Sequence, residues 1–246
     1  MYNYSFDNFI VSACNNRARN ACYTFAETAG EKNNPLIVYG NIGTGKTHLA
    51  IATFALLKEE HPEYKVLYVT AEEFANEVID SMRSINNAKE MNCFRERYRQ
   101  IDILIFDDLD WLQNKEATCS ELFFTVDKLL EDGKKIIFTS SKGISSLFQD
   151  SERIKSRIES YFQVSINGPD DHLIGEVMKS FNLEQRLDDE VKEYIKRKCE
   201  NSIRKLQGIF RTLAVNIESS GVEKITLDQI EEIVDGDISH KYRINI

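Results

Sequence analysis

The sequence predicts an α/β fold in which a parallel sheet is covered by helices on both faces and is followed by a small all-helical domain. Short apolar segments alternate with amphipathic stretches up to about residue 166, and this alternation is typical of a parallel sheet. After Asn167-Gly168-Pro169 every stretch has helical periodicity. We therefore expect an α/β domain over 1–167, a helical lid domain over 168–238 and a tail over 239–246.

The expected strands are short and rich in Ile, Val, Leu, Phe or Tyr, as a sheet buried on both faces requires. They cover 36–39, 65–70, 102–106, 135–140 and 161–165. Helices are expected between them at 46–60, 71–83, 87–99, 117–131 and 151–159. In the lid domain helices are expected at 170–180, 189–200, 202–219 and 226–235, two of them preceded by residues typical of helix N-termini.

Composition excludes several classes of protein. With 246 residues, 42% of them hydrophobic and 29% charged, the chain has the make-up of a globular protein. Five scattered cysteines without a C-x-x-C pair favour reduced thiols over a disulfide framework or a zinc site. No apolar run approaches the roughly 20 residues of a membrane span, and the N-terminus lacks the features of a signal peptide. We expect a cytoplasmic protein that does not bind membranes.

The net charge of −9 restricts contact with nucleic acid. An acidic surface repels the phosphate backbone at long range, so any DNA contact must come from a local basic patch.

The segment Gly40-Asn-Ile-Gly-Thr-Gly-Lys-Thr47 fits the pattern G-x-x-x-x-G-K-[ST], whose backbone N–H groups surround nucleotide phosphates. Lys46 would reach the β- and γ-phosphates, and the Thr47 hydroxyl would ligate Mg²⁺. A chance glycine turn is the alternative, but an apolar strand before the loop and an amphipathic helix after it favour function. The nucleotide-binding residues expected here are Gly40, Gly43, Thr44, Gly45, Lys46, Thr47 and His48.

A second nucleotide element is Ile101-Asp-Ile-Leu-Ile-Phe-Asp107-Asp108, an apolar strand that ends in two acids. Asp107 would hold Mg²⁺ directly or through water, and Asp108 would orient or deprotonate the water that attacks the γ-phosphate. Acids are also common at solvated strand ends, and the glycine loop upstream is what favours the functional interpretation.

Three weaker candidates follow along the chain. Ser141 ends the strand that begins at Lys135, where it could contact the γ-phosphate or simply form a turn. Arg153 and Arg157 share one helical face, which is either solvated or presents an arginine finger to a neighbouring subunit's ATP. Arg204 stands at the start of a lid helix, from which it could fold over bound nucleotide.

Together these segments resemble the AAA+ P-loop NTPase module of the bacterial replication initiator DnaA, over essentially the whole chain. The matching segments are Tyr4 to Val11, 45–49, 65–69, 107–108, 114–116, 121–124, 153–157 and 203–208. The resemblance implies that Phe9, Ile10 and Val11 pack near the adenine. It also implies that Arg157 is a finger acting in trans and that Arg204 is the sensor arginine of the lid.

The resemblance further implies that residues 71–99 form two extra helices that line the channel of an assembled filament and bind single-stranded DNA. Ile79, Lys115 and Thr118 match positions implicated in that contact, whereas Ala117 replaces a basic residue. Ser141 stands where the family usually has an acid.

The family continues into a helix-turn-helix domain that reads duplex DNA, and the eleven residues after Asp235 are too few for one. We expect either a fragment or a naturally short protein, without sequence-specific binding to duplex DNA.

The leading hypothesis is an ATP-binding, slowly hydrolysing module that uses ATP or ADP with Mg²⁺ and forms ATP-dependent homo-oligomers in replication initiation. A second hypothesis is a regulator or helicase loader that acts by contact with the full-length initiator or the replicative helicase. A third, a P-loop kinase of small molecules, is disfavoured because no acceptor-binding motif is visible.

Overall fold

The computed structural model describes residues 4–143, 146–148, 152–220 and 224–240. It divides into two compact units. The α/β unit consists of Met1–Phe9, Asn15–Gly40 and Gly45–Ile166, and the helical unit consists of Ile10–Cys14, Asn41–Thr44 and Asn167–Ile246. The helical unit therefore includes two short segments from the first part of the chain besides the lid residues that follow Ile166.

The α/β unit is built on a five-stranded sheet of order β2-β3-β4-β1-β5. The four pairings between its neighbouring strands are parallel. The strands are β1 (Leu36–Tyr39), β2 (Val66–Thr70), β3 (Ile103–Asp107), β4 (Lys135–Ser140) and β5 (Phe162–Ser165). The predicted fold class is thereby confirmed, and each strand lies within one residue of its predicted bounds.

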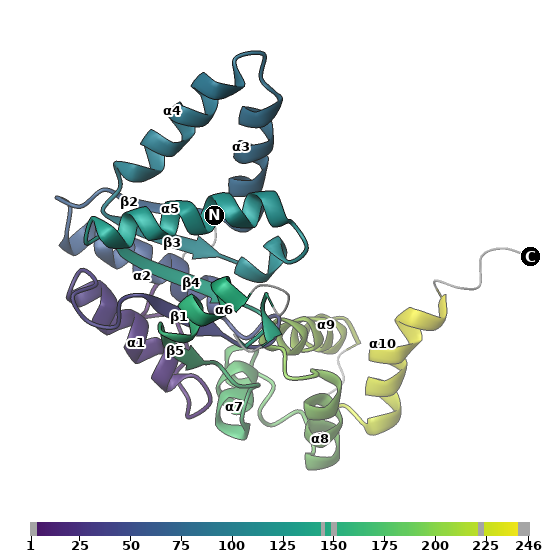
Figure 1. Cartoon of the computed structure of the whole chain (residues 1–246). Helices are drawn as coiled ribbons and strands as arrows, with labels where there is room; N and C mark the ends of the chain where they lie inside the picture. The colour runs from purple at the N-terminus through teal and green to yellow at the C-terminus, as the bar shows by residue number, and fades with distance from the viewer. Residues whose placement is uncertain (1–3, 144–145, 149–151, 221–223, 241–246) are drawn as a thin grey trace, which may run out of the picture. The chain divides into compact units, whose positions relative to one another are not determined.

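Helices cover both faces of this sheet because alternate residues of each strand point to opposite sides. On β1, Leu36 and Val38 pack with α1 (Asn16–Glu27) and α2 (Lys46–Glu60), whereas Ile37 packs on the other face. That second face is covered by α3 (Ala71–Arg83), α4 (Asn87–Arg99) and α5 (Glu116–Glu131) (Figure 1). A short 3-10 helix, η1 (Leu109–Leu112), follows β3, and α6 (Glu152–Glu159) precedes β5.

Helix α1 is the α-helix for which the sequence analysis gave no bounds. Its buried side chains are Ala18, Ala21, Cys22, Phe25 and Ala26, at the spacing of one helical face. Four of these five are small, so the stripe carries little hydrophobic signal. Its N-cap, Asn15, makes no side-chain capping bond, so the usual start signal is weak as well.

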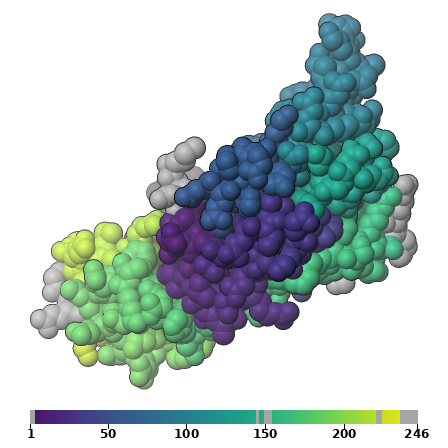
Figure 2. Space-filling model, turned by 90° about the vertical axis from the view of Figure 1, so that its left-hand side faces the viewer, coloured from purple at the N-terminus to yellow at the C-terminus, as the bar shows by residue number. Residues whose placement is uncertain are grey.

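Helices α3 and α4 form a hairpin that stands out from the sheet as an arm (Figures 1 and 2). Thr70 and Glu73 form a capping box that begins α3. Phe74 holds the base of the arm, since its ring contacts Phe94, Tyr98 and Phe106 at centroid distances of 5.3–5.4 Å. Beyond this cluster the hairpin becomes polar, and Ile85 between the two helices is fully exposed.

The helical unit contains α7 (Asp171–Ser180), α8 (Asp189–Lys198), α9 (Ile203–Ser220) and α10 (Leu227–His240). Its own core includes Leu206, Phe210 and Leu213 on α9 and Val177 on α7. Within residues 167–220 and 224–240 no strand occurs, and Leu187 and Ile225 form an isolated bridge. None of the described helices is both long and apolar enough to cross a membrane.

Candidate functional site

The candidate site lies at the carboxyl edge of three neighbouring strands. β4 lies between β1 and β3, and all three run in parallel, so their carboxyl ends meet at one edge of the sheet. The glycine loop follows β1, Asp107 ends β3 and is followed by Asp108, and Ser140 ends β4 and is followed by Ser141. The strand order thus brings together three elements that the sequence places far apart.

The glycine loop leads from β1 directly into α2. Gly45 is the N-cap of α2 with φ of 108°, a backbone conformation that residues with a Cβ rarely adopt. A Cβ on Gly40 would lie 2.2 Å from the carbonyl oxygen of Ile166. Lys46 is only 6% exposed, and its Nζ donates to the Gly40 carbonyl at 2.8 Å. The lysine therefore folds back across the loop, where an anionic group held by the loop would meet its ammonium.

Thr139 connects the two acids of β3 to β4. Asp107 is 1% exposed and accepts hydrogen bonds from the hydroxyl groups of Tyr68 and Thr139. The same Thr139 oxygen accepts from the backbone N–H of Asp108 at 2.9 Å. Asp108 has φ of 61° and an exposed side chain, so the chain turns sharply and sends the second carboxylate outward. Burial, and then the Asp107 carboxylate, raise the pKa of Tyr68, which keeps this phenol a donor.

Asp110 is a site residue that the sequence analysis missed. Its carboxylate accepts from the backbone N–H of Ser141 at 2.6 Å and from the Ser141 hydroxyl at 2.5 Å. Burial alone would raise the pKa of Asp110, but these hydrogen bonds from Ser141 hold it below its ordinary value. A carboxylate therefore lies beside position 141, although the chain has serine there. The spacing of Asp110 two residues after Asp108 gave no signal that it would reach another strand.

Thr47, His48 and Phe9 belong to the α/β unit. Thr47 lies half-buried in the first turn of α2. His48 contacts the Ser5 carbonyl through Nε2 at 2.8 Å, and its ring meets those of Tyr4 and Phe9. Burial lowers the pKa of His48 despite the hydrogen bond to Ser5, which would raise it. The predicted residues Phe9 and His48 are thus in direct contact, with ring centroids 5.0 Å apart.

The helical unit contains the other predicted nucleotide residues. Ile10 packs on the core of this unit, Val11 is 39% exposed, and Thr44 donates to the Asn41 carbonyl. The carbonyl of Gly43 accepts from the backbone N–H groups of Ile203 and Arg204 at 2.9 and 3.2 Å. The exposed side chain of Arg204 therefore starts from a backbone that is bonded to the glycine loop.

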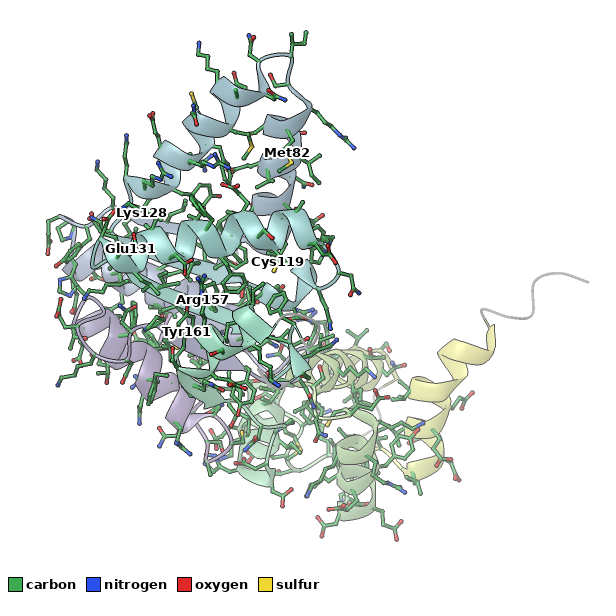
Figure 3. All side chains as sticks on the ribbon, in the orientation of Figure 1. Met82, Cys119, Lys128, Glu131, Arg157 and Tyr161 are labelled. Atoms are coloured by element: carbon green, nitrogen blue, oxygen red, sulfur yellow. The ribbon has the colours of Figure 1, made fainter. Side chains whose placement is uncertain are left out.

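Arg157 is paired within its own chain. Its Nη1 forms an ion pair with Oδ2 of Asp127 on α5, and the two side chains are 31% and 33% exposed. In Figure 3 Arg157 lies beside Tyr161 and next to α5, the helix that carries Lys128 and Glu131. Burial, and then Asp127, raise the pKa of Tyr161 to about 12, while Arg157 lowers it. The side chain of Arg153, the other predicted arginine of α6, lies outside the described residues.

The residues matched to single-stranded DNA contacts are not equally accessible. Lys115 donates to the Trp111 carbonyl, and its ammonium lies over the Trp111 ring. Thr118 is only 6% exposed and Ile79 is half-buried. Of these three residues, Lys115 is the one that carries a positive charge.

Thr47 in the first turn of α2 and Asp107 at the end of β3 suit a magnesium ion that is bound together with phosphate. The described residues contain no group of three or more His, Cys, Asp or Glu side chains able to hold a metal. Mg²⁺ usually keeps several waters and takes one or two protein ligands plus phosphate oxygens. A half-buried Thr47 hydroxyl and the Asp107 carboxylate are ligands of that kind.

The strand order, the glycine loop and the paired acids define a P-loop ATPase of the AAA+ class. Residues 1–165 match the family described as the bacterial DnaA ATPase domain, and the chain belongs to this family. It is 40% identical over 207 residues to the chromosomal replication initiator protein DnaA of Lachnoclostridium phytofermentans, covering 83% of this chain and 45% of that protein. The chain thus spans less than half the length of this relative.

Solved structures agree with this assignment. Domain III of the Thermotoga maritima DnaA is 29% identical, with a TM-score of 0.79 and coverage of 96% of this chain and 97% of that one. A DnaA bound to AMPPCP and single-stranded DNA is 28% identical, with a TM-score of 0.76 and coverage of 100% and 76%.

Proposed function

We propose that the chain binds ATP and hydrolyses it slowly, as a switch that controls assembly during the initiation of DNA replication. The observation that carries this proposal is the meeting of the glycine loop, Asp107-Asp108 and Ser141 at one sheet edge, where Thr139 is hydrogen-bonded to both acids. A relative with the same fold is described as bound to an ATP analogue.

Each residue has a role that follows from its position. The loop N–H groups and Lys46 bind the phosphates, while Phe9, Ile10 and Val11 contact the base. Thr47 and Asp107 would hold Mg²⁺, which would neutralise the negative charge of the phosphates. Asp108, whose carboxylate is exposed, orients the attacking water. The buried Asp107 keeps its place through Tyr68 and Thr139.

Assembly depends on ATP because the γ-phosphate adds a contact that ADP lacks. In this proposal Arg157 reaches the γ-phosphate of a neighbouring subunit, and Arg204 contacts the nucleotide of its own chain. Sedimentation of wild type and Arg157→Ala with ATP and with ADP tests the idea. We expect ATP-dependent assembly of wild type only. Equal assembly of both proteins with both nucleotides refutes the role of Arg157.

We further propose weak binding of single-stranded DNA through Lys115. The related structure that contains single-stranded DNA supports this contact, and the net charge of −9 argues that it is weak. Fluorescence anisotropy with short labelled single strands at low salt is the test. We expect binding with ATP and a loss of binding in Lys115→Ala, and the absence of any ATP-dependent signal refutes the proposal.

The partner in assembly is proposed to be a second copy of this chain. Co-purification with full-length initiator or with replicative helicase, compared at equal concentrations with self-association, is the direct comparison. Dominant binding to either of those proteins overturns the self-assembly proposal in favour of a regulator or loader.

A further inference from the structure

Residues Ile10–Cys14, which follow the expected base-binding residue Phe9, belong to the helical unit. Ile10 and Cys14 pack against the core of this unit. The Cys14 carbonyl accepts from the backbone N–H of Asn167 at 3.0 Å. The conformation of this N-terminal segment is therefore set by residues more than 150 positions away in the sequence.

The carboxylate of Asp170 accepts hydrogen bonds from two residues of this segment. Asp170 accepts from the Ser12 hydroxyl at 2.5 Å and from the backbone N–H of Cys14 at 3.1 Å. Its Oδ1 also accepts from the Leu173 N–H at 2.9 Å, which caps the N-terminus of α7. Asp170 thus joins the first turn of α7 to residues 12–14.

Asp170 accepts more hydrogen bonds than the single one that an ordinary helix N-cap requires. Burial alone would raise the pKa of Asp170, yet the hydrogen bonds from Ser12, Leu173 and Cys14 lower it. Ser12 is only 7% exposed, so little water can replace its bond to the carboxylate. A cap needs one oxygen, here Oδ1, whereas Oδ2 accepts from the Cys14 N–H and both oxygens lie 2.5 Å from the Ser12 hydroxyl oxygen.

We propose that Asp170 is a positioning residue for recognition of the nucleotide base. It fixes Ser12 and Cys14 and thereby places Ile10 and Val11, so the start of α7 sets base affinity from outside the glycine loop. The inference rests on the proposed function, because it takes Phe9, Ile10 and Val11 as the base contacts.

The test is Asp170→Asn, measured by calorimetric titration with Mg²⁺-ATP and with Mg²⁺-tripolyphosphate, which lacks base and ribose. Asparagine keeps one oxygen for the Leu173 N–H but presents an NH₂ group to the N–H of Cys14. We expect ATP affinity to fall about tenfold, as for a lost hydrogen bond to a charged group. Tripolyphosphate affinity should change less than twofold, since the glycine loop is untouched.

Two further variants separate positioning from stability. Asp188→Asn is the matched control, because Asp188 is the N-cap of α8, makes no side-chain capping bond and pairs with Lys224. It removes the same charge from the same unit and should leave both affinities unchanged. Ser12→Ala keeps Asp170 and its cap of α7 and should reproduce the selective loss of ATP affinity.

The outcomes are distinct. If wild type does not bind Mg²⁺-ATP, the proposed function fails. If wild type prefers ATP to tripolyphosphate but Asp170→Asn behaves like Asp188→Asn, only the inference about Asp170 fails. Equal losses of both ligands, together with a lower melting temperature, also overturn it, because Asp170 would then act on stability alone.

Discussion

The ion pair between Arg157 and Asp127 should oppose assembly, because the proposed trans-acting arginine is bonded to its own chain. In Asp127→Asn the arginine loses this charged partner and becomes available to a neighbouring nucleotide. The two side chains are 31% and 33% exposed. Partly exposed pairs contribute about 0–1 kcal/mol. Each 1.4 kcal/mol changes an equilibrium about tenfold, so the substitution should strengthen ATP-dependent assembly by up to about fivefold.

Sedimentation velocity over a range of protein concentrations, with ATP and with ADP, measures this change. Removing one acid from a chain of net charge −9 also reduces general repulsion between copies, so a control of equal charge is essential. Asp132→Asn serves, because Asp132 is the C-cap of α5 and pairs with Lys128 instead of Arg157. If Asp127→Asn assembles no better than Asp132→Asn, the pair does not restrain the arginine. Weaker assembly would mean that Asp127 orients Arg157 productively.

Three further predictions concern the glycine loop and its surroundings. Lys46→Ala should lower ATP affinity about 10- to 100-fold in calorimetry, as the loss of a charged hydrogen bond to phosphate implies, whereas exposed Lys58→Ala should not. Gly43→Ala should lower the melting temperature more than Gly133→Ala. Both glycines have positive φ, but only at Gly43 would a Cβ meet a side-chain oxygen, at 2.2 Å. Burial lowers the pKa of His48 in the folded protein below 6.5, because the fold favours the neutral imidazole. The stability that the neutral imidazole contributes is therefore present above pH 6.5 and is lost as pH falls through the pKa of the folded state. Thermal melts between about pH 7.5 and 5.5 should therefore show a smaller acid-induced loss for His48→Gln than for wild type; an equal loss would contradict this.

The sheet and its helices could be predicted because their signals are local. A strand such as Ile103–Asp107 is apolar at every position before its acid, and this run alone predicted 102–106, within one residue of the observed bounds. Helix α3 begins at a capping box whose two members, Thr70 and Glu73, are three residues apart. Helix α1 lacked both signals, since its buried face is mostly alanine and its N-cap residue makes no side-chain capping bond.

The partners of the site residues could not be predicted in the same way. Asp127 and Arg157 are 30 residues apart, Asp110 and Ser141 are 31 apart, and Ser12 and Asp170 are 158 apart. Each of these acids, considered alone, resembles a solvated surface residue. Only the fold shows that each carboxylate binds a residue on another element.

Gly43 of the glycine loop is hydrogen-bonded to the start of α9, where the proposed sensor arginine, Arg204, lies. The Gly43 carbonyl accepts from the N–H groups of Ile203 and Arg204, so the first turn of α9 and the tip of the loop share one set of hydrogen bonds. A rotation of α9 that redirects the Arg204 side chain must lengthen these bonds or carry Gly43 with it. Gly43 itself has a positive φ and lies three residues before Lys46. We therefore expect that, if Arg204 is the proposed sensor arginine, substitutions at Gly43 and Arg204 are not additive in their effect on ATP affinity.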